Sequence, residues 1–99
     1  MTDFSSTTSD NKCRWEINAD PWDVGMGDKS NAFHRTIIRP HTEELLDIRR
    51  GNYVLDIACG TGFFSERLAE KGSEVVAFDF SENMINYARK RRQAYCNSI

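Results

Sequence analysis

One segment constrains the fold more than any other: a short, almost continuous apolar run at residues 53–58 that ends in Cys-Gly-Thr-Gly. So short an apolar run predicts a strand of a parallel sheet, buried on both faces. Gly60 and Gly62 lack Cβ atoms, so the backbone can turn sharply there and a ligand can approach it closely. Open α/β sheets bind ligands just beyond the carboxyl ends of their strands. The segment therefore predicts a parallel α/β sheet with a ligand site after its first strand.

A second apolar run, at residues 74–78, predicts the neighbouring strand. Residues 63–71 between the two runs predict a short helix, and a strand–helix–strand unit of this length is a right-handed parallel crossover. The helix offers free N–H groups at its N-terminus, which suit an anionic group. Asp79 ends the second strand, so its carboxylate is expected beside the same crevice, where it can accept hydrogen bonds from two ribose hydroxyls.

Two details separate this loop from a dinucleotide site. The fingerprint G-x-G-x-x-G requires a third glycine, and Ser65 stands in its place. Asp56 lies inside the first strand, where a carboxylate opposes a nearby pyrophosphate but suits a cationic amino group. A nucleotide-cofactor oxidoreductase stays open as the alternative enzyme class.

Class I S-adenosylmethionine-dependent methyltransferases carry a motif I that the segment VLDIACGTG resembles. The segment VVAFDFSENMI is similar to the second-strand region that follows in that family. The stretch from Trp15 to Gly60 resembles the start of a bacterial branch that acts on small molecules. The resemblance covers the chain from about Trp15 onward. It implies S-adenosyl-L-methionine as cofactor and methyl transfer to an unidentified acceptor, expected to be a small molecule.

The resemblance also implies the positions that bind the cofactor: Asp56, Ala58, Cys59, Gly60, Gly62, Asp79, Phe80 and Met84. Asp56 is expected near the methionine amino group, directly or through water, although it also suits a cap on the next turn. The loop backbone is expected to contact the methionine and the sugar, and Asp79 the ribose hydroxyls. Phe80 and Met84 are expected to line the adenine, where stacking contributes roughly 1–3 kcal/mol per base, although both also suit an ordinary core. Cys59 is expected to be a small apolar filler, and the catalytic residues are unknown.

The fold that the resemblance implies is a Rossmann-like three-layer parallel sheet with strand order 3-2-1-4-5-7-6. Residues 51–99 are expected to form a partial S-adenosylmethionine-binding domain that ends after strand 2. Two parallel strands cannot cover both sheet faces as a whole domain does, and their outer edges stay unpaired. We therefore expect a truncated product that binds cofactor weakly and turns over nothing. The alternative is a non-catalytic fragment.

The N-terminal part divides into a lead-in and a helical segment. Residues 1–12, rich in Ser, Thr and Asp, are expected to be disordered. Residues 13–50 are expected to form an N-terminal helical or lid segment, irregular over 13–30 because no period of 2 or 3.6 holds there. Pro40 predicts a break near Arg39 and a fresh helix over residues 40–48. At the other end of the chain, residues 82–95 predict a helix with Ser81 as its N-cap.

Composition excludes several classes of function. The net charge of −2 gives no sign of a polyanionic partner, and the basic run at residues 89–92 suits the last turn of a helix better than nucleic acid. No apolar run is long enough to span a bilayer, and no secretory signal is visible. Widely spaced Cys13, Cys59 and Cys96 favour reduced thiols in the cytoplasm, and His34 and His41 are expected on a helix surface without a metal. The oligomeric state cannot be predicted.

Overall fold

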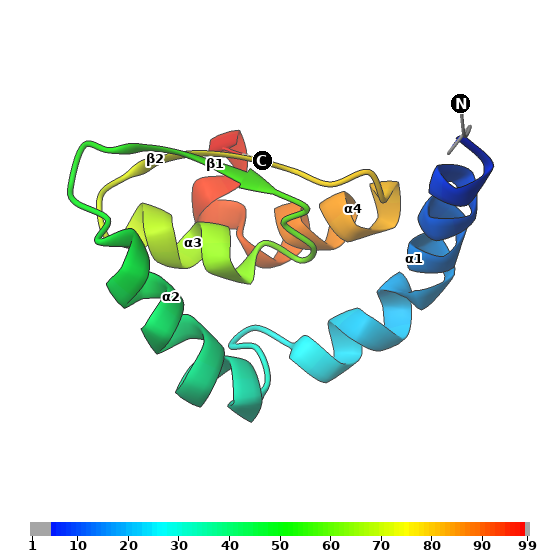
Figure 1. The fold of residues 1–99 in the computed structure, drawn as a ribbon, viewed down its shortest axis with the longest axis horizontal. Helices are drawn as coiled ribbons and strands as arrows, with labels where there is room; N and C mark the ends of the chain where they lie inside the picture. Colours follow the sequence, from blue (N-terminus) through cyan, green and yellow to red (C-terminus); the bar gives the residue numbers. More distant parts are fainter. Residues whose placement is uncertain (1–4, 99) are drawn as a thin grey trace.

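The structure, a computed structural model, describes residues 5–98 and the side chains of residues 7–95. Its elements follow one another along the chain (Figure 1) as helix α1 (Ser5–Met26), a π-helical turn (His34–Ile38), helix α2 (Arg39–Leu46), strand β1 (Tyr53–Ile57), helix α3 (Phe63–Glu70), strand β2 (Glu74–Phe78), helix α4 (Glu82–Arg91) and a 3-10 segment (Gln93–Ser98). No helix among these described residues is both long and apolar enough to cross a membrane.

The predicted strand–helix–strand unit is confirmed. Strands β1 and β2 pair in parallel, with Tyr53 opposite Glu74 and Ile57 opposite Phe78. Helix α3 connects them and packs against β2. The arrangement is the first part of a Rossmann-like α/β sheet, so the ligand site expected after β1 lies at the carboxyl edge of both strands.

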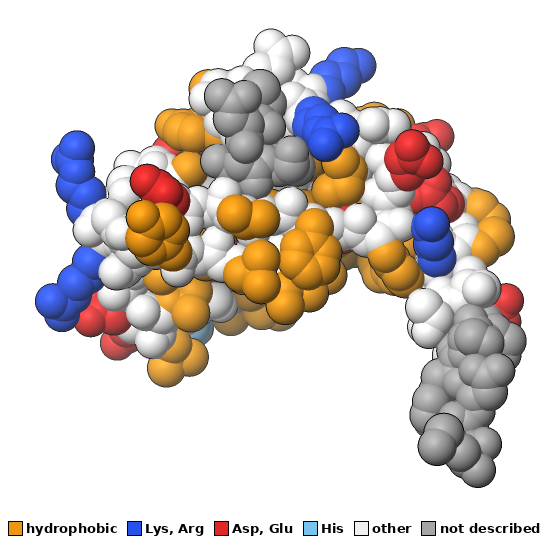
Figure 2. All heavy atoms as spheres, turned by 90° about the horizontal axis from the view of Figure 1, so that it is seen from above, with side chains coloured by type: hydrophobic (Ala, Val, Ile, Leu, Met, Phe, Trp, Pro, Cys, Tyr) orange, Lys and Arg blue, Asp and Glu red, His pale blue; other side chains and the backbone are white. Residues whose placement is uncertain are grey.

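The core lies on one face of this sheet. Leu68 of α3 packs there with Val75 and Ala77 of β2. The side chains of the opposite face are exposed and form an apolar patch over the sheet (Figure 2): Tyr53, Leu55, Ile57, Val76 and Phe78. The prediction of a first strand buried on both faces is therefore wrong. Alternate residues of each strand point to opposite faces, and the described helices pack on one face only, as expected for two strands alone.

Helix α1 corrects the expectation for the N-terminal part. Residues 5–12 belong to this helix where a disordered lead-in is expected, and most of the segment 13–30 is helical instead of irregular. Residues 1–4 lie outside the described residues. The helix bends along its length (Figure 1), as expected for a helix with Pro21 in its interior.

Two further helix boundaries differ from the prediction. The chain does not break at Arg39: the Arg39 N–H donates to the His34 carbonyl, and this wider π-turn runs directly into α2 with Pro40 in its first turn. The last helix, predicted to reach residue 95, ends at Arg91 and passes into a 3-10 segment. Its predicted N-cap is confirmed, because the Ser81 hydroxyl accepts a hydrogen bond from the Met84 N–H at 3.2 Å.

Candidate functional site

The loop between β1 and α3 has a strained backbone. Ala58, Gly60 and Gly62 have φ angles of 61°, 58° and 78°, in the left-handed region. Ala58 is the unusual member, because a residue with a Cβ rarely adopts this strained conformation. A Cβ placed on Gly60 would meet nothing within 4 Å, so the space beside the backbone is open. The loop therefore presents bare backbone to an open volume.

Asp79 fixes the loop from the neighbouring strand. Its Oδ2 accepts a hydrogen bond from the Gly60 N–H at 2.9 Å, and its Oδ1 accepts one from the Ser81 N–H at 2.9 Å. A carboxylate has about four acceptor sites, so each oxygen can still accept a hydrogen bond from a ligand. The predicted crevice between the two strand ends thus contains a carboxylate held by two backbone donors.

A cavity of about 180 Å³ opens at this carboxylate. Its lining joins the loop, the end of β2, α4 and α1: Trp15, Trp22, Ala58, Gly60, Asp79, Phe80 and Met84. The two tryptophans of α1 meet edge to face, with ring centres 5.5 Å apart. Phe80 is 44% exposed and so is not an ordinary core residue, whereas Met84 is buried and lines the cavity with one side. Five of the eight predicted cofactor positions lie together here.

A second cavity, of about 210 Å³, adjoins the first and shares Trp22, Ala58 and Gly60 with it. It contains Cys59, which brings a sixth predicted position to the site. It also contains His34, which is half-buried, although a helix-surface position is expected. A third cavity, of about 200 Å³, continues past His34 along the side chains Ile38, Arg39, Thr42, Phe63 and Phe64. The site is thus a row of hollows between the N-terminal helices and the loop.

Asp56 and Gly62 lie outside both of the first two cavity linings. The Asp56 Oδ2 accepts a hydrogen bond from the Ser65 hydroxyl at 2.5 Å, in the first turn of α3. Burial raises the pKa of Asp56, the Ser65 hydroxyl opposes this rise, and the Asp79 charge adds to it. The observed contact is between two side chains and does not cap α3, whose N-cap has no side-chain hydrogen bond, so both the capping role and contact with a ligand stay predictions. Gly62 is the N-cap of α3.

Cys59 is placed in the site without the chemistry of a nucleophile. Burial, followed by the charges of Asp56 and Asp79, raises the pKa of its thiol to about 12. The thiolate is the reactive form of cysteine, so this thiol is inert at neutral pH. No cluster of three or more His, Cys, Asp or Glu residues that could hold a metal ion occurs in the part of the chain that the structure describes.

Trp15, Trp22 and His34 belong to the segment that is expected from the sequence to fold over the site as a lid. The structure places all three in the cavity walls, whereas Phe33 of the same segment lies outside these three cavity linings. The tryptophans are large apolar residues on a helix with no apolar face. Such isolated large apolar residues are the sequence feature that indicates contact with something other than the helix's own core. His34 is brought to the loop by the π-turn, which a pattern of helical spacing does not predict.

These features define a Rossmann-like protein with a candidate cofactor site at the carboxyl ends of its strands. Residues 54–98 match the family model described as a methyltransferase domain. The malonyl-acyl carrier protein O-methyltransferase of Erwinia pyrifoliae is 41% identical over 75 residues, which are 73% of this chain and 29% of that protein. The 23S rRNA (uracil(1939)-C(5))-methyltransferase of Neisseria lactamica is 43% identical over 47 residues, 48% of this chain and 10% of that protein.

Solved structures agree with these relatives. The magnesium protoporphyrin IX methyltransferase of Synechocystis with bound S-adenosylhomocysteine matches with a TM-score of 0.64 and 26% identity, over 87% of this chain and 44% of that one. The chain thus spans less than half the length of the proteins that it matches. It belongs to the class I S-adenosylmethionine-dependent methyltransferase family, whose cofactor is S-adenosyl-L-methionine. Membership of this family favours the methyltransferase interpretation over the alternative, a nucleotide-cofactor oxidoreductase.

Proposed function

We propose that this chain binds S-adenosylmethionine in the cavity between Asp79 and the α1 tryptophans, as the cofactor-binding part of a methyltransferase that transfers the methyl group to a small-molecule acceptor. One observation carries the proposal. The Asp79 carboxylate, the open backbone at Gly60 and the apolar side chains of Phe80 and Met84 line a single cavity. A nucleoside needs these three surfaces: an acceptor for sugar hydroxyls, bare backbone, and apolar walls for a base.

Each predicted position has a role in this proposal. Asp79 accepts hydrogen bonds from both ribose hydroxyls, while Phe80 and Met84 enclose the adenine. The backbone from Ala58 to Gly62 contacts the sugar and the methionine part, which extends into the cavity with Cys59. Asp56 attracts the methionine amino group through a bridging water, because its carboxylate is engaged by Ser65 and lies outside the cavity lining.

These residues need to contribute little to the chemical step itself. The sulfonium carries an activated methyl group, so the protein contributes mainly position and a site shielded from water. The tryptophans of α1 line the cavity together with the loop and contribute to that shielding. We assign no general base, because the acceptor atom determines whether one is needed.

The acceptor is proposed to enter through the hollows that follow the loop. They are lined mainly by apolar and aromatic side chains around His34, Phe63 and Phe64, with Arg39 at one side. Such a lining favours a small apolar molecule over a polyanion, as does the net charge of −2. Two of the similar proteins act, by their names, on magnesium protoporphyrin IX and on malonyl-acyl carrier protein, and one acts on rRNA.

Two further parts of the proposal concern organisation and location. Residues 13–50 act as a segment that covers the cofactor-binding residues 51–99, because Trp15 and Trp22 line the cavity from that side. The cytoplasm is the proposed compartment, on the ground of widely spaced cysteines, and Cys13 and Cys59 are both free thiols. The side chain of Cys96 lies outside the described residues.

Thermal denaturation with two ligands tests the proposed cofactor. S-adenosylhomocysteine at saturating concentration raises the melting temperature of this chain, because a ligand of the folded state alone stabilises it by mass action. NAD at the same concentration leaves it unchanged. A shift with NAD and none with S-adenosylhomocysteine would contradict the proposal.

A further inference from the structure

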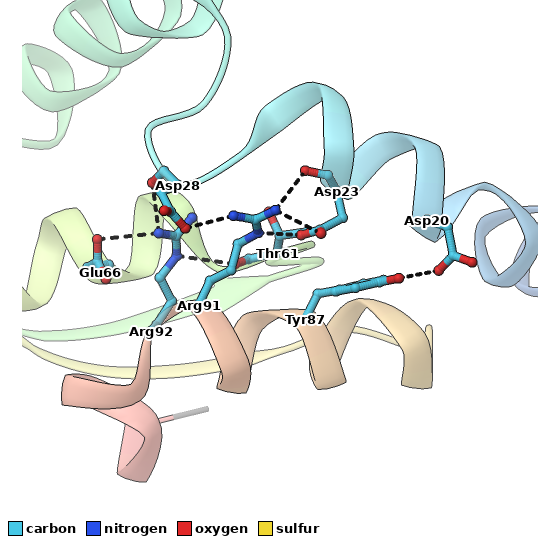
Figure 3. Close-up of polar contacts among 8 residues, drawn as sticks. All are labelled: Asp20, Asp23, Asp28, Thr61, Glu66, Tyr87, Arg91 and Arg92. Atoms are coloured by element: carbon cyan, nitrogen blue, oxygen red, sulfur yellow. Dashed lines mark hydrogen bonds and ion pairs between the residues drawn. The ribbon is translucent and has the colours of Figure 1, made fainter.

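Arg92 is buried at the end of α4, directly beneath the cofactor loop. Its side chain is 2% exposed, and it is the largest fully buried side chain in the described part of the chain. Its Nε donates to the Thr61 carbonyl oxygen at 3.3 Å and its Nη1 to the Asp28 carbonyl oxygen at 2.8 Å. The Glu66 carboxylate lies 3.5 Å from the same Nη1, and the guanidinium stands 5.5 Å from the centre of the Phe63 ring. Figure 3 shows the guanidinium in contact with the loop at Thr61, with the segment after α1 at Asp28, and with α3 at Glu66.

The Thr61 contact lies inside the loop that lines the cavity. Thr61 stands between Gly60 and Gly62, and it is buried. Asp79 holds the Gly60 N–H, and Arg92 holds the Thr61 carbonyl oxygen, so side chains from outside the loop fix successive residues of it. Because glycines leave a backbone free to adopt many conformations, such contacts are needed to select one.

The preceding arginine binds α1. The Arg91 guanidinium contacts both carboxylate oxygens of Asp23, at 2.6 Å from Nε and 2.9 Å from Nη2. Its Nη1 donates to Asp28 Oδ1 at 2.7 Å, and one turn earlier the Tyr87 hydroxyl donates to Asp20. Figure 3 shows this row of contacts along the two helices. A bidentate arginine–carboxylate pair fixes orientation as well as distance.

Burial of a guanidinium is unfavourable unless good contacts replace its water, and Nη2 of Arg92 has no hydrogen-bond partner within residues 5–98. An apolar side chain of similar length would fill this position without that cost. The arginine is therefore explained by what it connects, since it bridges the loop and the segment after α1.

We infer that Arg92 is a positioning residue for the cofactor loop. Through the Arg91–Arg92 pair, the conformation of the loop and the position of α1 against α4 depend on each other. Trp22 from α1 and Gly60 from the loop line the same cavity. A ligand that contacts both binds best when both are in place, so loss of Arg92 weakens binding although Arg92 does not touch the ligand. The inference rests on the proposed function only for the identity of that ligand.

Calorimetric titration with S-adenosylhomocysteine tests the inference on the full chain. Arg92→Met, which keeps the apolar stem, is expected to weaken binding about tenfold, and Arg92→Lys, which keeps the charge but loses the planar fork, is expected to recover part of that loss. Arg89→Met is the matched control, because Arg89 is an exposed cation in the last turn of the same helix. It should bind as the unchanged chain does. Binding by folded Arg92→Met within twofold of the unchanged chain would overturn the inference.

Hydrogen exchange separates this inference from the proposed function. Arg92→Met, or Arg92→Lys if the first variant does not fold, is expected to speed amide exchange at Gly62 and within α1, while β1 and β2 keep their protection. This readout needs no ligand. If the unchanged chain fails to bind S-adenosylhomocysteine, the proposed function fails, and the exchange data still decide on Arg92. Unchanged exchange in the loop and α1, or a uniform increase that includes the strands, would overturn the inference.

Discussion

The carboxylate of Asp79 both holds the backbone of the loop and lines the cavity. It accepts hydrogen bonds from the backbone at Gly60 and Ser81, and it still faces the cavity. The sequence predicts its position because the carboxyl ends of neighbouring parallel strands meet at one edge of the sheet. The sequence does not predict that Ala58 adopts a left-handed conformation, because local propensity disfavours it and only the surrounding contacts impose it.

The thiol of Cys59 gives a prediction that needs no ligand. Because burial and the neighbouring charges raise its pKa to about 12, almost no thiolate exists at pH 8. Iodoacetamide should therefore modify the exposed Cys13 long before Cys59, as measured by peptide mass spectrometry over time. Modification of both residues at equal rates in the folded chain would contradict the placement of Cys59.

Asp56 predicts a pH dependence for cofactor binding. Burial raises its pKa in the free protein, whereas a nearby ligand ammonium group favours the charged carboxylate and lowers it. Binding therefore releases a proton, and affinity for S-adenosylhomocysteine is full above the free-protein pKa and falls as the pH drops through it. Titrations across this range measure the effect, and Asp56→Asn should remove this part of the pH dependence. Equal pH dependence in both proteins would contradict a role for Asp56 in binding.

Helix α1 is an element that reasoning from apolar periodicity misses for a physical reason. Its contact face toward α4 is polar: Glu16, Asp20 and Asp23 recur at helical spacing and meet Ser81, Tyr87 and Arg91. A search for apolar stripes does not detect a helix held by carboxylates. The strands and α3 are predictable because their apolar residues face the core, as Leu68, Val75 and Ala77 do.

Ser81 connects two elements and predicts a stability effect. Its hydroxyl caps α4 by accepting from the Met84 N–H, and it donates to a Glu16 carboxylate oxygen at 2.6 Å. Ser81→Ala removes the cap and one polar link to α1, so the free energy of unfolding should fall by about 1–2 kcal/mol in urea denaturation. Ser81→Thr keeps the hydroxyl and should restore most of it. A loss below about 0.3 kcal/mol for alanine would show that the cap contributes little.

At the scale of the whole molecule, the helices and the core lie on one side of the sheet, and an apolar face remains open on the other. Continuous apolar strands are typical of a sheet covered on both faces, so the strand pattern alone predicts more burial than the described residues provide. The proposed cofactor site does not depend on the uncovered face, because its lining comes from the loop, α1, the residues that follow β2 and the start of α4.

This face predicts a measurable surface property. Leu55 and Val76 are 58% and 62% exposed, so changing both to threonine removes little buried area and should alter the free energy of unfolding by less than about 1 kcal/mol. Binding of the dye ANS, which reports exposed apolar surface, should fall clearly. The buried pair Leu68 and Val75 provides the contrast, because threonine there should destabilise the chain. A large loss of stability from the exposed pair would show that this face is covered in solution.

The most direct test of the account is a calorimetric titration of S-adenosylhomocysteine into the unchanged chain and into Asp79→Asn. Asparagine has nearly the same shape, but it loses the charge that strengthens hydrogen bonds from ribose hydroxyls, a contribution of about 1.5–3 kcal/mol. Glu74→Gln, which removes an exposed carboxylate at the start of the strand that precedes Asp79, is the control. The account predicts saturable binding by the unchanged chain and by the control, and binding at least about tenfold weaker for Asp79→Asn. Equal affinity in all three proteins would contradict it.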